Sequence, residues 1–118
     1  MNKREIGTIY ERQAQQFLLD KGVRILERNY RCRQGEIDII GYDGTCLVFF
    51  EVKARDSGRA GTGAEAVNLR KQRTICRVAD YYRMKHRVSE FTELRYDCIA
   101  IDNGKIAWIK NAFSHVWA

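Results

Sequence analysis

Proline is absent from the sequence, and no stretch approaches the roughly 20 consecutive apolar residues that a membrane-spanning helix needs. Without proline, long irregular linkers are not expected. The amino-terminal residues Met1 to Glu5 lead directly into an amphipathic pattern that includes an acid at Glu11, which is not the composition of a signal peptide. We therefore expect one soluble, cytoplasmic domain over residues 1–118, without a membrane partner.

Metal-binding patterns built from cysteine and histidine are also lacking. The two histidines are isolated, and the four cysteines form no Cys-x-x-Cys pair: Cys32, Cys46, Cys76 and Cys98. This spacing excludes the usual zinc sites, and a disulfide framework is not expected in a cytosolic chain with its own core. Cys46 and Cys98 lie inside apolar runs, so we interpret both as small core residues.

Acidic residues are outnumbered, with 15 Asp and Glu against 21 Lys and Arg, for a formal net charge of +6. A basic balance favours polyanionic partners, because each phosphate contact releases condensed counterions. A modest positive charge is also a common means of keeping a protein soluble. Charge alone leaves both interpretations open.

Two helices are predicted. The first runs from about Lys3 to Lys21 and ends at Gly22; its apolar residues fall within an arc of about 120°, with Glu11 on the rim of that arc. The second runs from about Ala64 to Lys85 after the glycine-rich residues 56–63, which indicate a loop. Its apolar stripe is Val67, Ile75, Val78, Ala79 and Tyr82, and its basic residues include Arg70, Lys71, Arg73 and Arg77.

Five strands are predicted, over residues 23–31, 36–42, 45–55, 94–101 and 105–110. The centre of the third, Cys46–Phe50, is apolar on both faces, which is typical of a strand in the middle of a sheet that is covered on each side. Asp43-Gly44 and Asp102-Asn103-Gly104 are hairpin turns. The order α-β-β-β-α-β-β predicts an α/β fold, a mixed central sheet flanked by helices.

The Asp43-Gly44 hairpin brings two acids together. If these two residues form the loop, Asp38 lies opposite Phe49, and Asp38 and Glu51 become diagonal neighbours on one face of the sheet. Lys53 shares that face because it lies two residues beyond Glu51. The inference depends on parity, since a three-residue loop would turn Asp38 to the opposite face.

Two carboxylates and a lysine in this arrangement suit phosphodiester hydrolysis. Mg²⁺ held by Asp38 and Glu51 would polarise a phosphate and lower the pKa of a bound water, and Lys53 would orient that water or stabilise the developing negative charge. The structural alternative is that Glu51 and Lys53 mark the solvated end of a strand. A short pattern of this kind also arises by chance.

Three further residues border this site in the prediction. Glu11 would reach the same metal from the first helix, or pair with a neighbouring arginine. Lys71 is in line with Val67 and Ile75, so it would contact phosphate near the site or extend along the edge of the core. Glu36, expected opposite Glu51, is either a spare ligand or a rim residue.

Two segments resemble a known family: GEIDII at Gly35–Ile40 and LVFFEVKAR at Leu47–Arg55. They resemble the uncharacterised bacterial YraN-type family (UPF0102), which is similar to Holliday-junction resolvases and, more broadly, to the PD-(D/E)xK restriction-endonuclease-like nucleases. Further matches to the family pattern span nearly the whole chain: Gly7, Glu11, Ala14, Asn29-Tyr30-Arg31, Lys71, Ala79, Arg95-Tyr96-Asp97 and Asn111-Ala112-Phe113.

The resemblance implies a restriction-endonuclease-like core with Asp38, Glu51 and Lys53 as active-site residues and Glu11 as an accessory acid and metal ligand. It implies an endonuclease that uses Mg²⁺, or Mn²⁺ in its place, on DNA, including branched or structured DNA. The residues expected to bind the nucleic acid are Arg55, Arg70, Lys71, Arg73 and Arg77. Junction resolvases work as dimers, so a homodimer is expected by analogy.

Two other functions stay open. The first is a nucleic-acid-binding accessory protein that keeps the nuclease fold and cuts little or not at all. The second is an assembly or interaction domain whose basic helix meets an acidic protein. The intact Asp38, Glu51 and Lys53 set favours the enzyme, because a binding protein has no need for acids that are costly to bury.

Overall fold

The computed structural model describes residues 1–55 and 67–116. Its elements follow the predicted order: α1 (Lys3–Asp20), β1 (Arg24–Cys32), β2 (Gly35–Asp43), β3 (Cys46–Arg55), α3 (Leu69–Lys85), β4 (Leu94–Asp102) and β5 (Lys105–Phe113). The α/β fold class with a mixed sheet is therefore confirmed. Neither of the helices in these two ranges is long and apolar enough to cross a membrane.

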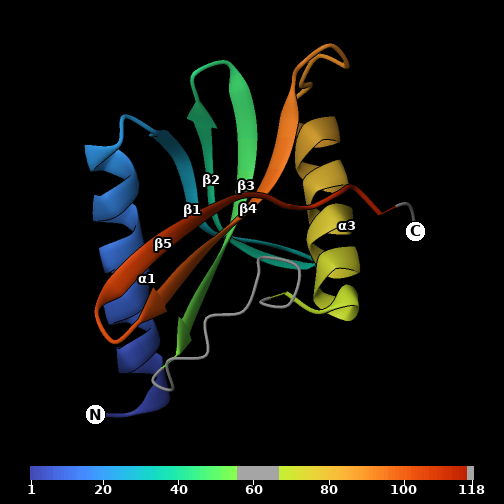
Figure 1. The fold of residues 1–118 in the computed structure, drawn as a ribbon. Helices are drawn as coiled ribbons and strands as arrows, with labels where there is room; N and C mark the ends of the chain where they lie inside the picture. The colour runs from blue at the N-terminus through green and yellow to red at the C-terminus, as the bar shows by residue number, and fades with distance from the viewer. Residues whose placement is uncertain (56–66, 117–118) are drawn as a thin grey trace.

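The five strands form one sheet in the order β1-β2-β3-β4-β5. The pair β3 and β4 is parallel, and the other neighbours are antiparallel. The segment between β3 and β4, which includes α3, therefore forms a crossover connection, as a parallel pair requires. Helix α1 lies against one face of the sheet and α3 against the other (Figure 1). The predicted central position of residues 46–55 is confirmed, because β3 is the middle strand of the sheet.

The core consists of two apolar layers, one on each face of the sheet. On the α3 side, Phe49 and Tyr96 of the sheet pack with Ile75, Val78 and the other buried residues of the helix stripe. On the α1 side, Ala14 and Leu18 pack with strand residues that include Val48, Phe50 and Ile99. Alternate residues of β3 thus enter different layers, which explains why its centre is apolar at every position.

Capping residues set the helix boundaries. The side chain of Asn2 accepts from the backbone N–H of Glu5, and that of Asn68 accepts from Lys71 at 2.9 Å. Gly22 follows the carboxyl end of α1 with a φ of +88°, which confirms its predicted role as the stop. The predicted start of the second helix at Ala64 lies outside the described residues, but the prediction is wrong for Val67 and Asn68, because Asn68 caps a helix that begins at Leu69.

The predicted register of the β2–β3 hairpin is wrong by two residues. Asp43 pairs with Cys46, so Gly44 and Thr45 form the turn in place of Asp43-Gly44, and Phe49 lies opposite Ile40, not Asp38. A two-residue error preserves the face to which each side chain points, because the side-chain period of a strand is two. The second predicted hairpin is confirmed, with Asn103 and Gly104 both at positive φ between Asp102 and Lys105.

Candidate functional site

Asp38 and Glu51 lie where the ladder between β2 and β3 stops. The last recorded pair joins Ile39 to Phe50. Past this pair, the backbone N–H of Val52 donates a hydrogen bond of 2.8 Å to the Asp38 carboxylate. This side chain takes the place that a backbone carbonyl of β2 would have in a regular ladder. This bond holds the Asp38 carboxylate against the backbone directly after Glu51. The two acids are therefore neighbours at the site where the strands separate.

Burial raises the pKa of both acids. Glu51 is 7% exposed, and its removal from water raises its pKa to about 7, with the adjacent Asp38 charge as the next cause. The pKa of Asp38 is raised to about 6, mainly by burial and in part by Glu11, while the bond from Val52 opposes the rise. Two buried acids that repel each other favour the binding of either protons or a cation.

Two lysines reduce this repulsion. The Nζ atom of Lys71 lies 3.8 Å from Oε1 of Glu51, which confirms that Lys71 faces the sheet from the first turn of α3. The positive charge of Lys53 lowers the pKa of Glu51, as does that of Lys71. Lys53 lies two residues beyond Glu51 on β3, so the two side chains leave the strand on the same face.

Glu11 borders the pair from α1. It is half-buried, which confirms its predicted place on the rim of the helix face, and its charge raises the pKa of Asp38. The side-chain amide of Asn29 faces the Glu11 carboxylate, and with its nitrogen turned toward that group it donates at 3.2 and 3.3 Å. Asn29 has a φ of +50°, an unusual conformation for a residue other than glycine.

Glu36 does not lie opposite Glu51, and that prediction is wrong for the same register reason. Its partner in the sheet is Arg31, whose Nε atom lies 2.9 Å from Oε2 of Glu36. The Glu36 side chain is 38% exposed, and its charge makes only a minor contribution to the raised pKa values of Asp38 and Glu51. Glu36 is therefore a rim residue.

The donor set of this site is small. Within residues 1–55 and 67–116, no three Asp, Glu, His or Cys side chains are grouped so that together they hold a metal ion. Asp38 and Glu51 are thus a pair, and Glu11 does not complete a three-ligand cage. A pair fits Mg²⁺, which commonly binds through one or two carboxylates and keeps the rest of its shell for water and substrate phosphate.

Basic side chains continue from this site along α3. Arg70, Arg73 and Arg77 are exposed, and their spacing places them within an arc of about 60° on the helix surface. Lys71, near the amino end of α3, faces the acids, whereas this row lies about 100–160° around the helix from Lys71. The Arg55 side chain and residues 56–63, also predicted to flank the site, lie outside the part of the chain that is described at side-chain level.

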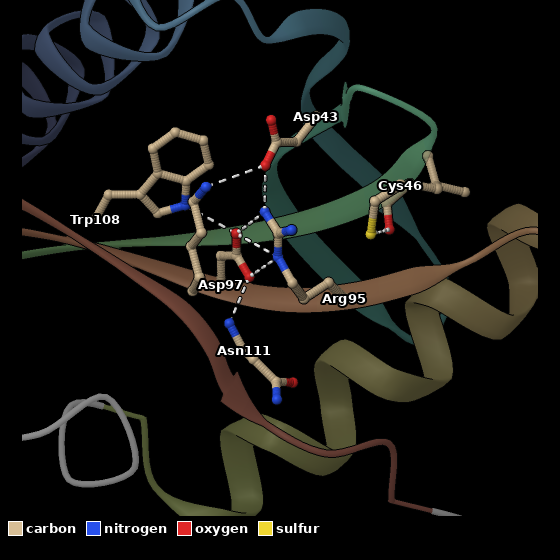
Figure 2. Close-up of polar contacts among 8 residues, drawn as sticks. Asp43, Cys46, Arg95, Asp97, Trp108 and Asn111 are labelled. Atoms are coloured by element: carbon tan, nitrogen blue, oxygen red, sulfur yellow. Dashed lines mark hydrogen bonds and ion pairs between the residues drawn. The ribbon is translucent and has the colours of Figure 1, made fainter.

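A second polar cluster, centred on Asp97, was not identified by its chemistry in the sequence. Asp97 is fully buried and accepts from Arg95, from Trp108 Nε1 and from the backbone N–H of Asn111, with shortest distances of 2.8 Å (Figure 2). Arg95 also donates to Asp43 at 2.8 Å, and this bond lowers the pKa of Asp43. Hydrogen bonding to Asp97 in turn raises the pKa of Arg95.

The Asp97 cluster lies on the opposite face of the sheet from Glu51. Asp97 pairs with Phe50, which packs in the α1-side layer, whereas Glu51 is the next residue and points toward α3. The cluster therefore joins β4 to β5 and to the β2–β3 hairpin, and it takes no part in the acid pair. Its only signal in the sequence is a charged pair, Arg95 and Asp97, that interrupts an apolar strand.

The sequence of this protein is similar to those of a known protein family over most of its length. Residues 10–101 match a family described as "Uncharacterised protein family UPF0102". The chain belongs to the UPF0102 family. A UPF0102 protein of Alkaliphilus oremlandii is 48% identical over 118 residues, covering 96% of this chain and all of the relative. One from Lachnoclostridium phytofermentans is 43% identical, with 96% of each chain covered. One from Photobacterium profundum is 44% identical, covering 94% of this chain and 91% of the relative.

The part of the chain that matches the UPF0102 family includes every acid and lysine of the site, from Glu11 to Lys71. The predicted family is thus confirmed. Family membership assigns no reaction to these residues, so the chemistry of this UPF0102 protein has to be argued from their geometry.

Proposed function

We propose that this UPF0102 protein is a metal-dependent endonuclease that hydrolyses phosphodiester bonds of DNA. The observation that supports this most strongly is the acid pair: the buried Glu51 and the partly buried Asp38 lie side by side with raised pKa values and have lysines as neighbours. Such an arrangement destabilises a protein unless a ligand compensates for it, and perturbed carboxyl pKa values cluster at functional sites.

Asp38 and Glu51 would hold Mg²⁺, or Mn²⁺ in its place, with Glu11 as an accessory acid near Asp38. The bound ion would polarise a phosphate and supply an activated water at neutral pH. Lys53 would orient the attacking water or stabilise the negative charge that develops on the phosphate. Lys71, whose Nζ atom lies 3.8 Å from Glu51, would turn to a phosphate oxygen once a metal ion neutralises the charge of that acid.

The DNA would lie along α3, with its backbone against Arg70, Arg73 and Arg77. Contacts of this kind fix the position of DNA and carry little sequence information. The similarity of the family to junction resolvases extends the proposal to branched or structured DNA and to a homodimer.

A second function deserves a test because Glu51 already has a cationic partner and no third acid completes a cage within the described residues. The protein would then bind nucleic acid with the same basic surface and cut little. The acid pair would serve as a structural ion-pair site with Lys71.

A cleavage assay distinguishes the two functions. The protein is incubated with duplex, single-stranded, flap and four-way-junction DNA in Mg²⁺, Mn²⁺ or EDTA. For a nuclease, we expect metal-dependent products that Asp38→Asn abolishes and that the control Glu90→Gln, at an exposed loop position, leaves unchanged. DNA binding without cleavage of any substrate in either metal would favour the accessory protein.

A further inference from the structure

An open cavity of about 800 Å³ lies far from the acid pair. Its walls come from the α1–β1 turn, the β2–β3 hairpin and the segment between α3 and β4, which meet at one end of the sheet (Figure 1). The acid pair lies toward the other end of β3. The volume is within the range of small-molecule sites. Besides two glycines, the cavity is lined by the cation Arg24, the acid Glu93, the aromatic residues Tyr42 and Phe91, and the hydroxyl residues Thr45, Ser89 and Thr92.

Phe91 is displayed at this cavity by a hydrogen-bonded turn. Its side chain is 89% exposed, the highest value among the large hydrophobic residues of the described ranges. The backbone N–H of Phe91 donates to Ser89 Oγ at 3.1 Å, and that of Thr92 donates to the Ser89 carbonyl at 3.0 Å. The turn therefore holds an aromatic ring in solvent beside the cavity, in a position prepared for an aromatic partner.

Arg24 and Tyr42 form a second flat surface in the same cavity. The guanidinium carbon of Arg24 lies 5.3 Å from the centroid of the Tyr42 ring. Tyr42 also packs against the α3-side core layer, so its ring is anchored. A guanidinium held over an anchored ring presents its other face for stacking, and it adds a positive charge.

We propose that this cavity binds an unpaired nucleobase of the nucleic acid, stacked on Phe91 and on the Arg24–Tyr42 pair. Every base has a π face, and stacking on aromatic rings and guanidinium planes is how proteins hold unpaired bases. The hydroxyl groups of Thr45, Ser89 and Thr92 supply donors and acceptors for a base edge. A net charge of +6 favours a nucleic acid over a basic or neutral peptide as the occupant.

This inference rests on the proposed function in one respect, namely that the nucleic acid is DNA. If it holds, the preferred substrate is DNA that has unpaired bases next to a duplex. Cys46, at the cavity end of β3, is five residues from Glu51, a separation of about 17 Å along the strand. At that separation the unpaired base and the phosphate at the acid pair would belong to different nucleotides of the same nucleic acid.

The test is a binding measurement without turnover, in EDTA. The probes are a blunt duplex and the same duplex with a single-stranded extension that contains 2-aminopurine, whose fluorescence is quenched on stacking. We expect wild type to prefer the extended duplex and to quench the probe. Phe91→Ala should lower affinity for the extended duplex about tenfold and remove the quenching, with blunt-duplex affinity unchanged. Arg24→Gln should have a smaller effect in the same direction.

Leu19→Ala is the matched control, since Leu19 is 52% exposed and does not line the cavity. Equal affinity of wild type and Phe91→Ala for the extended duplex, with unchanged quenching, would overturn the proposal. A change in self-association of Phe91→Ala, with base binding intact, would overturn it in favour of a protein contact. If the protein binds the unpaired base but never cleaves DNA, the proposed nuclease activity is wrong and the base-binding site stands. If it cleaves DNA but shows no preference for unpaired bases, the nuclease stands and the base-binding site is wrong.

Discussion

At the scale of single residues, Glu51 is the acid whose ionisation the fold opposes most clearly. Its carboxyl group is almost removed from water and faces a second acid, so ionisation is opposed by desolvation and by repulsion. Lys71 at 3.8 Å compensates only in part, because the lysine side chain is itself 40% exposed and its charge is screened by solvent. The pair therefore stores unfavourable free energy that protons or a metal ion would relieve.

The first prediction concerns pH. The unfolded carboxyl groups lose their protons near pH 4, whereas the folded pKa values are about 6 for Asp38 and about 7 for Glu51. Because both pKa values are raised by folding, the folded state binds more protons between these limits, and the free energy of unfolding falls as pH rises from 4 to 8. We expect the metal-free protein to lose on the order of 3 kcal/mol over this window from Glu51 alone, because the pKa of Glu51 rises from 4.5 to about 7 on folding.

Urea unfolding in EDTA at pH 4.5 and pH 8 measures this loss. Glu51→Gln should flatten the pH dependence and be more stable than wild type at pH 8, whereas Glu90→Gln should follow wild type. Addition of Mg²⁺ at pH 8 should stabilise wild type and leave Glu51→Gln unaffected. Parallel pH profiles for wild type and Glu51→Gln would show that folding does not raise the pKa of Glu51.

The second prediction separates cleavage from binding. Glu51→Gln keeps the size of the side chain and removes the charge that would hold Mg²⁺. Cleavage should fall by at least about a hundredfold, while DNA binding is retained or strengthened, because a negative charge near the phosphates is gone. Lys53→Ala should also abolish cleavage and weaken binding only slightly, since other cations line α3. Both effects are read from gel-based cleavage and from anisotropy titrations; parallel losses of cleavage and binding in Glu51→Gln would contradict the assignment.

The sequence was sufficient to place Glu51 and Lys53 on one face of β3 by strand alternation, and the hairpin brought Asp38 next to them. It did not show that alternation is interrupted at Asp38, where the flanking Ile37 and Ile39 enter different core layers. It was insufficient for Asp97. The three groups that donate to this carboxylate belong to Arg95, Trp108 and Asn111, two of which lie on the next strand in a register altered by a bulge after Tyr96. Complete burial of an acid becomes visible only when that register is known.

At the scale of elements, the Asp97 cluster holds the second half of the sheet together. It joins β4 to β5 through Trp108 and Asn111, and to the β2–β3 hairpin through the Arg95–Asp43 pair. Lys110 of β5 adds an ion pair to Asp43 at 3.4 Å and lies over the Trp108 ring. The strands that place Glu51 are thereby held in register from the opposite face.

The third prediction is that Asp97→Ala destabilises the fold by about 3–5 kcal/mol, because it leaves the guanidinium of Arg95 and the indole N–H of Trp108 without their buried acceptor. Asp43→Ala should lower the free energy of unfolding by less, because the Asp43 side chain is 26% exposed and water can take its place as the hydrogen-bond acceptor of Arg95. Urea unfolding at pH 7 measures both. A loss under about 1 kcal/mol for Asp97→Ala would mean that the cluster does not stabilise the sheet.

The apolar pattern of β2 and β3 predicts which face each side chain takes, but it does not determine which residues pair across the hairpin. Asp43-Gly44 and Gly44-Thr45 are both acceptable two-residue turns, and each keeps the apolar side chains of β3 in their layers. The choice depends on contacts outside the hairpin, among them the Arg95–Asp43 ion pair. Helix caps were easier to predict, since Gly22 acts through its own conformation.

At the scale of the whole molecule, the strand order and the two apolar layers follow from periodicity. Basic charge is distributed less evenly, with the row Arg70, Arg73 and Arg77 on the exposed surface of α3, the helix whose Lys71 contacts Glu51. Helix α1 covers the opposite face of the sheet, so its charges are separated from this row by the core (Figure 1). Net charge could be counted from the sequence, but the face of the sheet that α3 and its arginines cover became known only with the structure.

The last prediction tests this distribution through salt dependence. Each phosphate neutralised by the protein adds about 0.9 to the slope of log affinity against log salt. Arg73→Ala and Arg77→Ala should each weaken binding to any DNA sequence and lower that slope by about 1. Arg4→Ala removes the same charge from α1, where screening over about 8–10 Å separates it from the DNA, so its slope should stay near that of wild type. Equal slope changes for all three variants would show that net charge attracts the DNA, and that α3 is not the surface on which it lies.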